Sequence, residues 1–215
     1  MRILSINVGQ PREVQLQHGT ALTSIFKMPV PGRRAVRRHN IEGDRQADLR
    51  VHGGPYKAVY AYASENYHYW LDELPDADLM PGAFGENLTL AGLTEGDAFI
   101  GDQYRVGSAV LQITQPRMPC FKLNIRFNRS DMVKRFWRGN HSGMYFSVVE
   151  EGEVEPGDEI QLLHRDSIAV SILDVVRLYK GETHDEDLLR RVLQSPLRGS
   201  WKQGIEETAR QATLL

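Results

Sequence analysis

The single cysteine of the chain lies between two cationic side chains. Cys120 follows a run of alternating apolar residues at 110–115 and stands in a loop with two prolines. Arg117 precedes it by three residues and Lys122 follows it by two. Neighbouring cations favour the thiolate, the form that attacks electrophiles and binds soft metals. The spacing therefore makes Cys120 a candidate nucleophile or metal ligand, although a lone cysteine in an apolar stretch is often just a small buried hydrophobe.

A second polar stretch, GDRQADLRVHGGPYK, precedes a predicted strand. His52 stands directly before a glycine pair that begins at Gly53, and Lys57 starts the strand. Paired glycines allow a backbone to approach a ligand closely and to present N–H groups to an anion. The alternative is a glycine turn with solvated charges.

A third stretch, GAFGENL, ends at the start of another predicted strand. Glu86 and Asn87 offer a carboxylate and an amide, which could hydrogen-bond the edge of a heterocycle. They could equally close a turn between the strands.

The elements that must position these residues are mostly short strands. Glycine turns separate them, and many short strands with close turn signals are typical of a barrel or sandwich. A helix is expected after Ser64 and another between Ser130 and Gly139, whereas the proline- and glycine-rich segment 29–54 is expected to be a long loop. The predicted strands are residues 2–8, 22–27 and 57–63, and then NLTL, DAFIG, QYRVG, AVLQIT, MYFSVVE and EIQLL.

The pattern changes to helix after about residue 167. Ser171 and Asp174 resemble a capping box, and three apolar stripes at helical spacing follow. We therefore expect one domain over residues 1–166 and a small three-helix domain over 167–215. The last helix is mixed in charge rather than basic, so a DNA-binding helix-turn-helix is disfavoured.

Composition limits the classes of function. The net charge of −2 gives no reason to expect a nucleic-acid partner. One cysteine excludes an internal disulfide and a cluster with four cysteine ligands, and it fits a reducing cytoplasm. No apolar run approaches the ~20 residues that span a bilayer, so we expect a cytoplasmic protein without a membrane partner. The basic cluster RRAVRRH is either a solvated mobile loop or a guide for an anionic ligand.

Common cofactor and catalytic fingerprints are missing from the sequence. It contains no GxGxxG, GxxxxGK[ST], HExxH, paired CxxC or GxSxG motif. The sequence therefore signals neither a nucleotide cofactor nor a zinc site nor a serine nucleophile.

Four long motifs together resemble the MOSC domain, the fold found at the C-terminus of molybdenum-cofactor sulfurases. They are GDRQADLRVHGGPYKAVYAY, GAFGENLTLAGLTE, RVGSAVLQITQPRMPCFKLN and GMYFSVVEEGEVEPGDEI, and they cover most of the chain in the family's order. The chain is most similar to stand-alone bacterial members of the YiiM type, which are linked to resistance to 6-hydroxylaminopurine and end in a small three-helix domain. The resemblance implies a mainly β fold, a MOSC-type β-barrel with flanking helices plus that C-terminal domain.

The resemblance also implies a molybdenum cofactor, a pterin dithiolene that bears a phosphate. Cys120 would supply the protein thiolate to molybdenum. Lys57, Arg117 and Lys122 would then meet phosphate or dithiolene charge, and Glu86 and Asn87 the edge of the pterin. The implied cofactor-binding set is His52, Gly53, Lys57, Glu86, Asn87, Arg117 and Lys122.

From this resemblance we expect a molybdenum-dependent oxidoreductase that reduces N-hydroxylated compounds such as 6-hydroxylaminopurine, a detoxifying activity. Electrons would come from a separate reductase protein, because the chain has no flavin or nicotinamide fingerprint. The alternative is a carrier of the cofactor, or of sulfur on Cys120, without turnover. Exposed strand edges in a barrel of this size are compatible with a homodimer.

Overall fold

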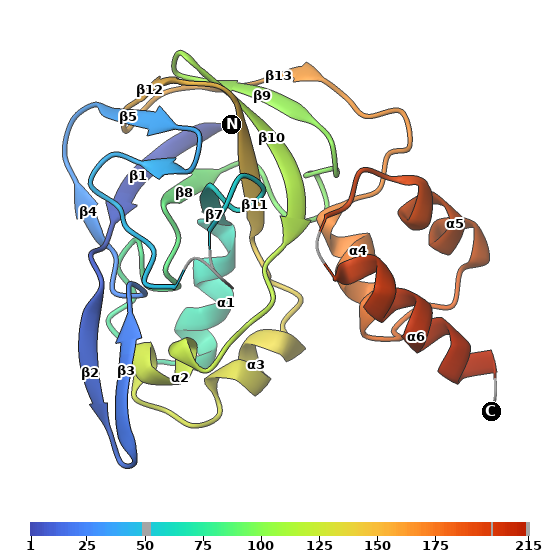
Figure 1. Cartoon of the computed structure of the whole chain (residues 1–215), viewed down its shortest axis with the longest axis horizontal. Helices are drawn as coiled ribbons and strands as arrows, with labels where there is room; N and C mark the ends of the chain where they lie inside the picture. Colours follow the sequence, from blue (N-terminus) through green and yellow to red (C-terminus); the bar gives the residue numbers. More distant parts are fainter. Residues whose placement is uncertain (49–52, 199, 214–215) are drawn as a thin grey trace.

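The computed structural model describes residues 1–48, 53–198 and 200–213 of the 215-residue chain. A mixed eight-stranded sheet forms the body of the molecule (Figure 1). All its neighbouring strands are antiparallel except β7 and β8, which are parallel. In order across the sheet the strands are β13 (Ile160–His164), β9 (Gln103–Val106), β10 (Ala109–Pro116), β11 (Met144–Glu150), β7 (Val59–Ala63), β8 (Leu88–Ala91), β1 (Arg2–Val8) and β4 (Met28–Val30).

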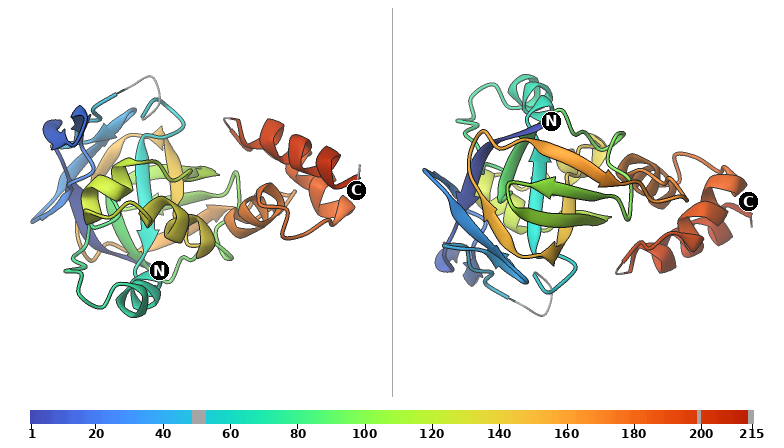
Figure 2. Two further views of the ribbon diagram at one scale, coloured as in Figure 1. Left: turned by 90° about the horizontal axis from the view of Figure 1, so that it is seen from below. Right: turned by 90° about the horizontal axis from the view of Figure 1, so that it is seen from above.

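The sheet curls around a buried apolar core (Figure 2). The edge strand β13 approaches the start of β1, where the amide of Ile3 donates to the carbonyl of Asp158 at 2.9 Å and the amide of Ile160 donates to the carbonyl of Met1 at 2.9 Å. Every residue of β7 is buried, as expected for a β-branched and aromatic strand at the centre of a sheet. The predicted mainly β class is confirmed, and full closure of the sheet into a barrel stays a prediction.

Two smaller sheets correct the sequence prediction for residues 29–54. This segment is not one long loop, because it contains β5 (Arg34–Arg37) and β6 (Asn40–Ile41), and β4 begins just before it. β5 pairs with β12 (Gly152–Val154), a strand more than 100 residues away that the local pattern does not reveal. The second small sheet is the hairpin of β2 (Arg12–Leu16) and β3 (Gly19–Thr23).

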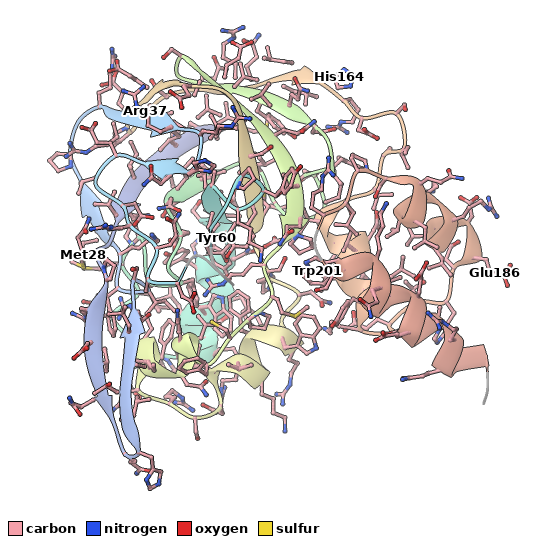
Figure 3. The ribbon with its side chains drawn as sticks, in the orientation of Figure 1. Met28, Arg37, Tyr60, His164, Glu186 and Trp201 are labelled. Atoms are coloured by element: carbon pink, nitrogen blue, oxygen red, sulfur yellow. The ribbon has the colours of Figure 1, made fainter. Side chains whose placement is uncertain are left out.

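Two arginines of the basic cluster RRAVRRH, Arg33 and Arg37, pair with an acidic stretch at 151–155, although their side chains stay exposed to solvent. The guanidinium of Arg33 lies 2.8 Å from a carboxylate oxygen of Glu155, and that of Arg37 lies 3.5 Å from Glu151. Arg37 stands on β5, near the top of the molecule as Figure 3 draws it. These contacts supply anionic partners from within the chain.

Two other predicted strands differ from the structure. The strand expected at 22–27 is β3, which ends at Thr23, and residues 97–101 form turns with one isolated bridge from Phe99 to Ser171. In these places Ile25, Ala98 and Ile100 are buried although their backbone is irregular, so burial without a strand contributed to the strand-like pattern.

Three helices lie at one end of the sheet: α1 (Glu65–Glu73), α2 (Lys122–Phe127) and α3 (Met132–Arg138) (Figure 1). The predicted cap positions of Ser64 and Gly139 are confirmed, although the hydroxyl of Ser64 makes no capping bond. The N-cap of α3 is Asp131, one residue later than predicted. The sequence did not predict α2, which begins two residues after Cys120.

The C-terminal helices are α4 (Ile172–Tyr179), α5 (Glu186–Gln194) and α6 (Trp201–Thr213). The capping box of Ser171 and Asp174 is confirmed, with both hydrogen bonds at 3.0 Å. The helices pack to one side of the sheet, yet their buried side chains belong to the same apolar cluster as those of the sheet (Figure 1). The division into domains 1–166 and 167–215 stays a prediction. Within the described part of the chain, no helix has the length and apolar character needed to cross a membrane.

Candidate functional site

One pocket gathers residues from distant parts of the sequence at the end of the sheet where α2 lies. Its space, including the open mouth, is about 580 Å³. Its walls come from the segment after β3, the loops before β7 and β8, and the β10–α2 connection. The described lining residues are Thr23, Ser24, Ile25, Lys27, Asp44, Gln46, Ala47, Gly53, Lys57, Tyr60, Gly85, Asn87, Arg117, Cys120, Lys122 and Tyr145.

Cys120 lies in this pocket on the short connection between β10 and α2. The strand ends at Pro116, and the amide of Leu123 donates to the carbonyl of Cys120 at 3.0 Å. The residue is half-buried, and Met118 and Phe121 on either side of it are exposed. The thiol is therefore held by a strand end and a helix start while it keeps access to the pocket.

Arg117 is buried beside Cys120 and is fixed by aromatic rings. Its guanidinium lies 4.7 Å from the ring centroid of Tyr60 and 5.6 Å from that of Phe136, and Nη1 donates to the carbonyl of Phe84. Burial lowers the pKa of Arg117, but its electrostatic interactions with Tyr60, Tyr145 and Cys120 raise it more, and the net shift is upward. The pocket therefore contains a permanent, oriented positive charge.

Two lysines add to this positive charge. Lys122 is the first residue of α2 and is only 9% exposed. Lys57 follows the glycine pair, and burial lowers its pKa. Gly53 and Gly54 have φ angles of 91° and 84°, a left-handed conformation that explains why the sequence has glycine at both positions. Gly53 and Lys57 line the same pocket as Cys120, as the prediction requires.

Asn87 also lines the pocket, although its amide is tied to the sheet. The amide of Tyr60 donates to Oδ1 of Asn87 at 3.2 Å, and Nδ2 donates to the carbonyl of Asn7 at 3.4 Å. Tyr60 lies near the middle of the sheet body (Figure 3). The parallel pairing of β7 and β8 thus carries Asn87 to the pocket wall.

Glu86 is not among the described residues that line the pocket, and its contact with a ligand stays a prediction. Its side chain is fully buried, and its carboxylate accepts hydrogen bonds from the amides of Gly82 at 2.8 Å and Phe84 at 3.1 Å, and from the hydroxyls of Thr89 at 2.9 Å and Tyr67. Burial raises its pKa, while these hydrogen bonds oppose the shift. These bonds hold the loop before β8 in shape, whereas the neighbour Asn87 lines the pocket.

His52, the remaining predicted residue, lies outside the described residues. Gly53 begins the described part of that stretch.

Sequence reasoning missed an ion pair in the pocket. The ammonium of Lys27 contacts Oδ1 of Asp44, and the two residues are 7% and 5% exposed. Asp44 belongs to the GDRQAD stretch that was already singled out, so its position gave a signal. Lys27 gave no such signal in the sequence, because it lies in irregular backbone after β3.

Two polar atoms of the pocket residues have no hydrogen-bond partner among the residues that the structure describes. They are Oγ of Ser24 and Oδ2 of Asp44, and both are buried. Buried polar atoms are nearly always satisfied, so each such exception needs an explanation. A polar ligand in the pocket would provide one.

Comparison with known proteins identifies the family. The family model for the MOSC domain matches residues 48–161. The chain is 40% identical over 201 residues to the uncharacterized protein YflK of Bacillus subtilis, an alignment that covers 93% of this chain and 90% of YflK. It is 32% identical to a protein of Gibberella moniliformis named a reductase, over 98% of this chain and 38% of that protein.

A solved structure supports the same assignment along nearly the whole chain. The crystal structure of YiiM from Geobacillus stearothermophilus matches with a TM-score of 0.79 and 34% identity, covering 97% of this chain and 98% of that one. The match includes the C-terminal helices as well as the sheet. The chain therefore belongs to the MOSC-domain family and is a YiiM-like member of it.

Proposed function

We propose that the protein is a molybdenum-cofactor-binding oxidoreductase that reduces N-hydroxylated compounds such as 6-hydroxylaminopurine, with Cys120 as the protein ligand to molybdenum. The observation that carries the proposal is the presence in one pocket of this thiol with Arg117, Lys122 and Lys57. Membership of the MOSC family and a relative named a reductase support it.

The chemistry of the pocket fits the cofactor. A thiolate is a soft ligand of the kind that such metals accept. Lys27 and Asp44 neutralise each other, so the three other cations of the described lining leave it positive. The cofactor's phosphate and dithiolene are anionic and would meet these cations. Ser24 Oγ and Asp44 Oδ2, which lack partners among the described residues, would meet its polar hydrogen-bonding groups.

When bound, the cofactor would supply a metal that exchanges oxygen and electrons with the substrate. The overall reaction is R–NHOH + 2 e⁻ + 2 H⁺ → R–NH₂ + H₂O, in which the N–O bond breaks. Lys57 Nζ is the candidate to deliver one proton, because burial lowers its pKa and makes proton release easier than from an exposed lysine. Arg117, fixed between rings, would orient the anionic part of the cofactor. The electrons would come from a separate reductase protein.

Metal analysis tests the role of Cys120. We expect wild-type protein, purified gently from cells supplied with molybdate, to contain molybdenum and pterin, and the variant Cys120→Ala to lose the molybdenum. Met118→Ala is the matched control, because Met118 is an exposed neighbour on the same connection that does not line the pocket. Equal molybdenum in wild type and Cys120→Ala would contradict the ligand role.

A turnover assay tests the reaction. Wild-type protein that carries molybdenum should convert 6-hydroxylaminopurine to adenine with a reduced viologen dye as electron donor. If the loaded protein leaves 6-hydroxylaminopurine unchanged while the dye stays reduced, the reductase proposal is wrong. A persulfide on Cys120 in protein without molybdenum, detected by mass spectrometry, would instead indicate a sulfur carrier.

A further inference from the structure

Asp44 has two carboxylate oxygens in very different surroundings. The ammonium of Lys27 and the amide of Gly9, at 2.8 Å, both contact Oδ1. Oδ2 is buried and has no hydrogen-bond partner within residues 1–48, 53–198 and 200–213. The residue is 95% buried, as its exposed fraction is 5%, and it lines the same pocket as Cys120. Contacts among the described residues therefore hold Oδ1 of Asp44 but not Oδ2.

The backbone around Asp44 is held firmly in place. Its amide donates to the carbonyl of Ile41 at 2.9 Å, and its carbonyl accepts from Nδ2 of Asn40 at 3.1 Å. Gly43 precedes it with a φ of 89°, which makes a tight turn after β6. Because backbone and Oδ1 are both fixed, the side chain cannot simply rotate to find a partner for Oδ2. A ligand in the pocket is then a source of the donor that the described residues do not supply.

Lys27 is the buried partner of this carboxylate, since its ammonium contacts Oδ1. An isolated buried carboxylate would take up a proton, whereas a direct ammonium partner favours the ionised form. Burial lowers the pKa of Lys27, and Asp44 opposes that shift. With the ion pair formed on Oδ1, Oδ2 remains an acceptor only and would meet an N–H or O–H group.

We propose that Oδ2 of Asp44 recognises the N–H donor edge of an aminopyrimidine-type ring. The proposal rests on the proposed function, which supplies two sources of such an edge: the 2-amino and ring N–H groups of the cofactor's pterin, and the N–H groups of a purine substrate. Asp44 thereby takes the role that the sequence prediction gave to Glu86. Arg117 and Lys122, which line the same pocket, would then bind the anionic part of the ligand.

Binding of two fragments to full-length protein purified without cofactor tests the recognition directly. Pterin carries the 2-amino group, whereas lumazine has a carbonyl oxygen in its place that would face the carboxylate. We expect wild type to prefer pterin by about ten-fold or more, as for a hydrogen bond to a charged group. Asp44→Asn should remove most of that preference. Absence of a preference in wild type, or an unchanged preference in Asp44→Asn, would overturn the proposal.

The double variant Lys27→Met with Asp44→Asn separates recognition from a purely structural ion pair. Asp44→Asn alone leaves Lys27 buried without its partner and can unfold the protein, whereas the double variant removes both charges. If the pair is only structural, the folded double variant keeps the wild-type preference for pterin over lumazine. If Asp44 recognises the ring, the double variant regains thermal stability but not the preference.

A third measurement distinguishes the two sources of the ring. Pterin released on denaturation, counted per chain by its fluorescence after oxidation, should fall in Asp44→Asn protein if the cofactor is the partner. If the pterin content is unchanged and the KM for 6-hydroxylaminopurine rises, the substrate is the partner. If neither changes, Asp44 recognises neither and the proposal fails. Because the fragment assay needs neither metal nor turnover, it can succeed even where the reductase proposal fails.

Discussion

The guanidinium of Arg198 lies over the ring of Tyr56, with Cζ 4.6 Å from the ring centroid. Arg198 stands between α5 and α6, and its amide donates to the carbonyl of Thr114 at 3.4 Å. The hydroxyl of Thr114 in turn donates to the carbonyl of Tyr56 at 2.6 Å. The C-terminal helices thus contact the loop that brings Gly53 and Lys57 to the pocket.

We predict that Arg198→Ala weakens ligand binding in the pocket by a few-fold without a large loss of stability. An exposed cation–π contact contributes about 0.5–1 kcal/mol, so the fold should survive while the loop loses a support. Pterin affinity and molybdenum content measure the effect, and thermal unfolding measures the stability. Arg210→Ala is the control, because Arg210 is an exposed arginine on α6 whose carboxylate partner lies 4.0 Å away. Equal effects of the two variants would show that Arg198 does not support the loop.

Aromatic side chains connect α3 to the C-terminal helices, so we expect the whole chain to unfold as one unit. Trp137 of α3 lies 5.6 Å from Tyr179 and 6.4 Å from Trp201, and these two rings lie 4.8 Å apart. Trp201 is buried on the side of the helices that faces the sheet (Figure 3). We expect coincident urea transitions by far-ultraviolet circular dichroism and by tryptophan fluorescence.

The variant Trp201→Ala should destabilise that single transition by about 3–5 kcal/mol, the usual range for a buried aromatic residue. Trp201→Phe should lose less, because the ring contact with Tyr179 remains. Two separate transitions in wild type would instead support independent domains at 1–166 and 167–215.

The local pattern predicted what depends on near neighbours in the sequence. The strand predicted at 110–115, the capping box at Ser171 and the need for glycine at Gly53 are local properties, and the structure contains all three, although β10 is buried along nearly its whole length rather than on alternate residues. Arg117 and Cys120 share the pocket partly because only three residues separate them. Such features follow from backbone geometry that the residue types themselves impose.

The features that the sequence did not predict depend on contacts between residues far apart in the chain. Lys27 and Asp44 meet across 17 residues and a small sheet, and no periodicity links them. Glu86 was assigned to the ligand because a carboxylate in a turn can point either way, and only the fold shows that its own loop surrounds it. The contact of Arg198 with Tyr56 joins positions 142 residues apart, which is beyond any local signal.

Arg117 should be irreplaceable by lysine. Its planar group lies against the ring of Tyr60 and donates to the carbonyl of Phe84, whereas an ammonium keeps the charge but loses the plane and the fork of donors. We predict that Arg117→Lys retains the fold but lowers pterin and molybdenum retention by about ten-fold, as for a lost hydrogen bond of a charged group. Arg117→Met should lower it further, because the charge is also lost. Wild-type retention in Arg117→Lys would mean that only the charge matters.

Glu95 offers a test of the electrostatics of the fold away from the pocket. Its Oε1 accepts from the amide of Gly143 at 2.7 Å and from Nδ2 of Asn66 at 2.9 Å, and the residue is 4% exposed. Burial raises its pKa above the ordinary value of 4.5, although these hydrogen bonds oppose the shift. Between 4.5 and the raised pKa the folded protein binds more protons than the unfolded chain. The stability due to Glu95 is therefore complete below 4.5 and is lost as the pH rises through this interval.

We predict that the variant Glu95→Gln becomes more stable relative to wild type as the pH rises from about 5 to about 8. The glutamine oxygen can accept both short hydrogen bonds at Oε1 but does not titrate, so it escapes the cost of a buried charge. Buried Glu86, whose pKa is also raised, is present in both proteins, and its contribution cancels in the difference. Urea unfolding of the two proteins at each pH gives that difference. A difference that stays constant or falls with pH would mean that the pKa of Glu95 is not raised in the folded protein.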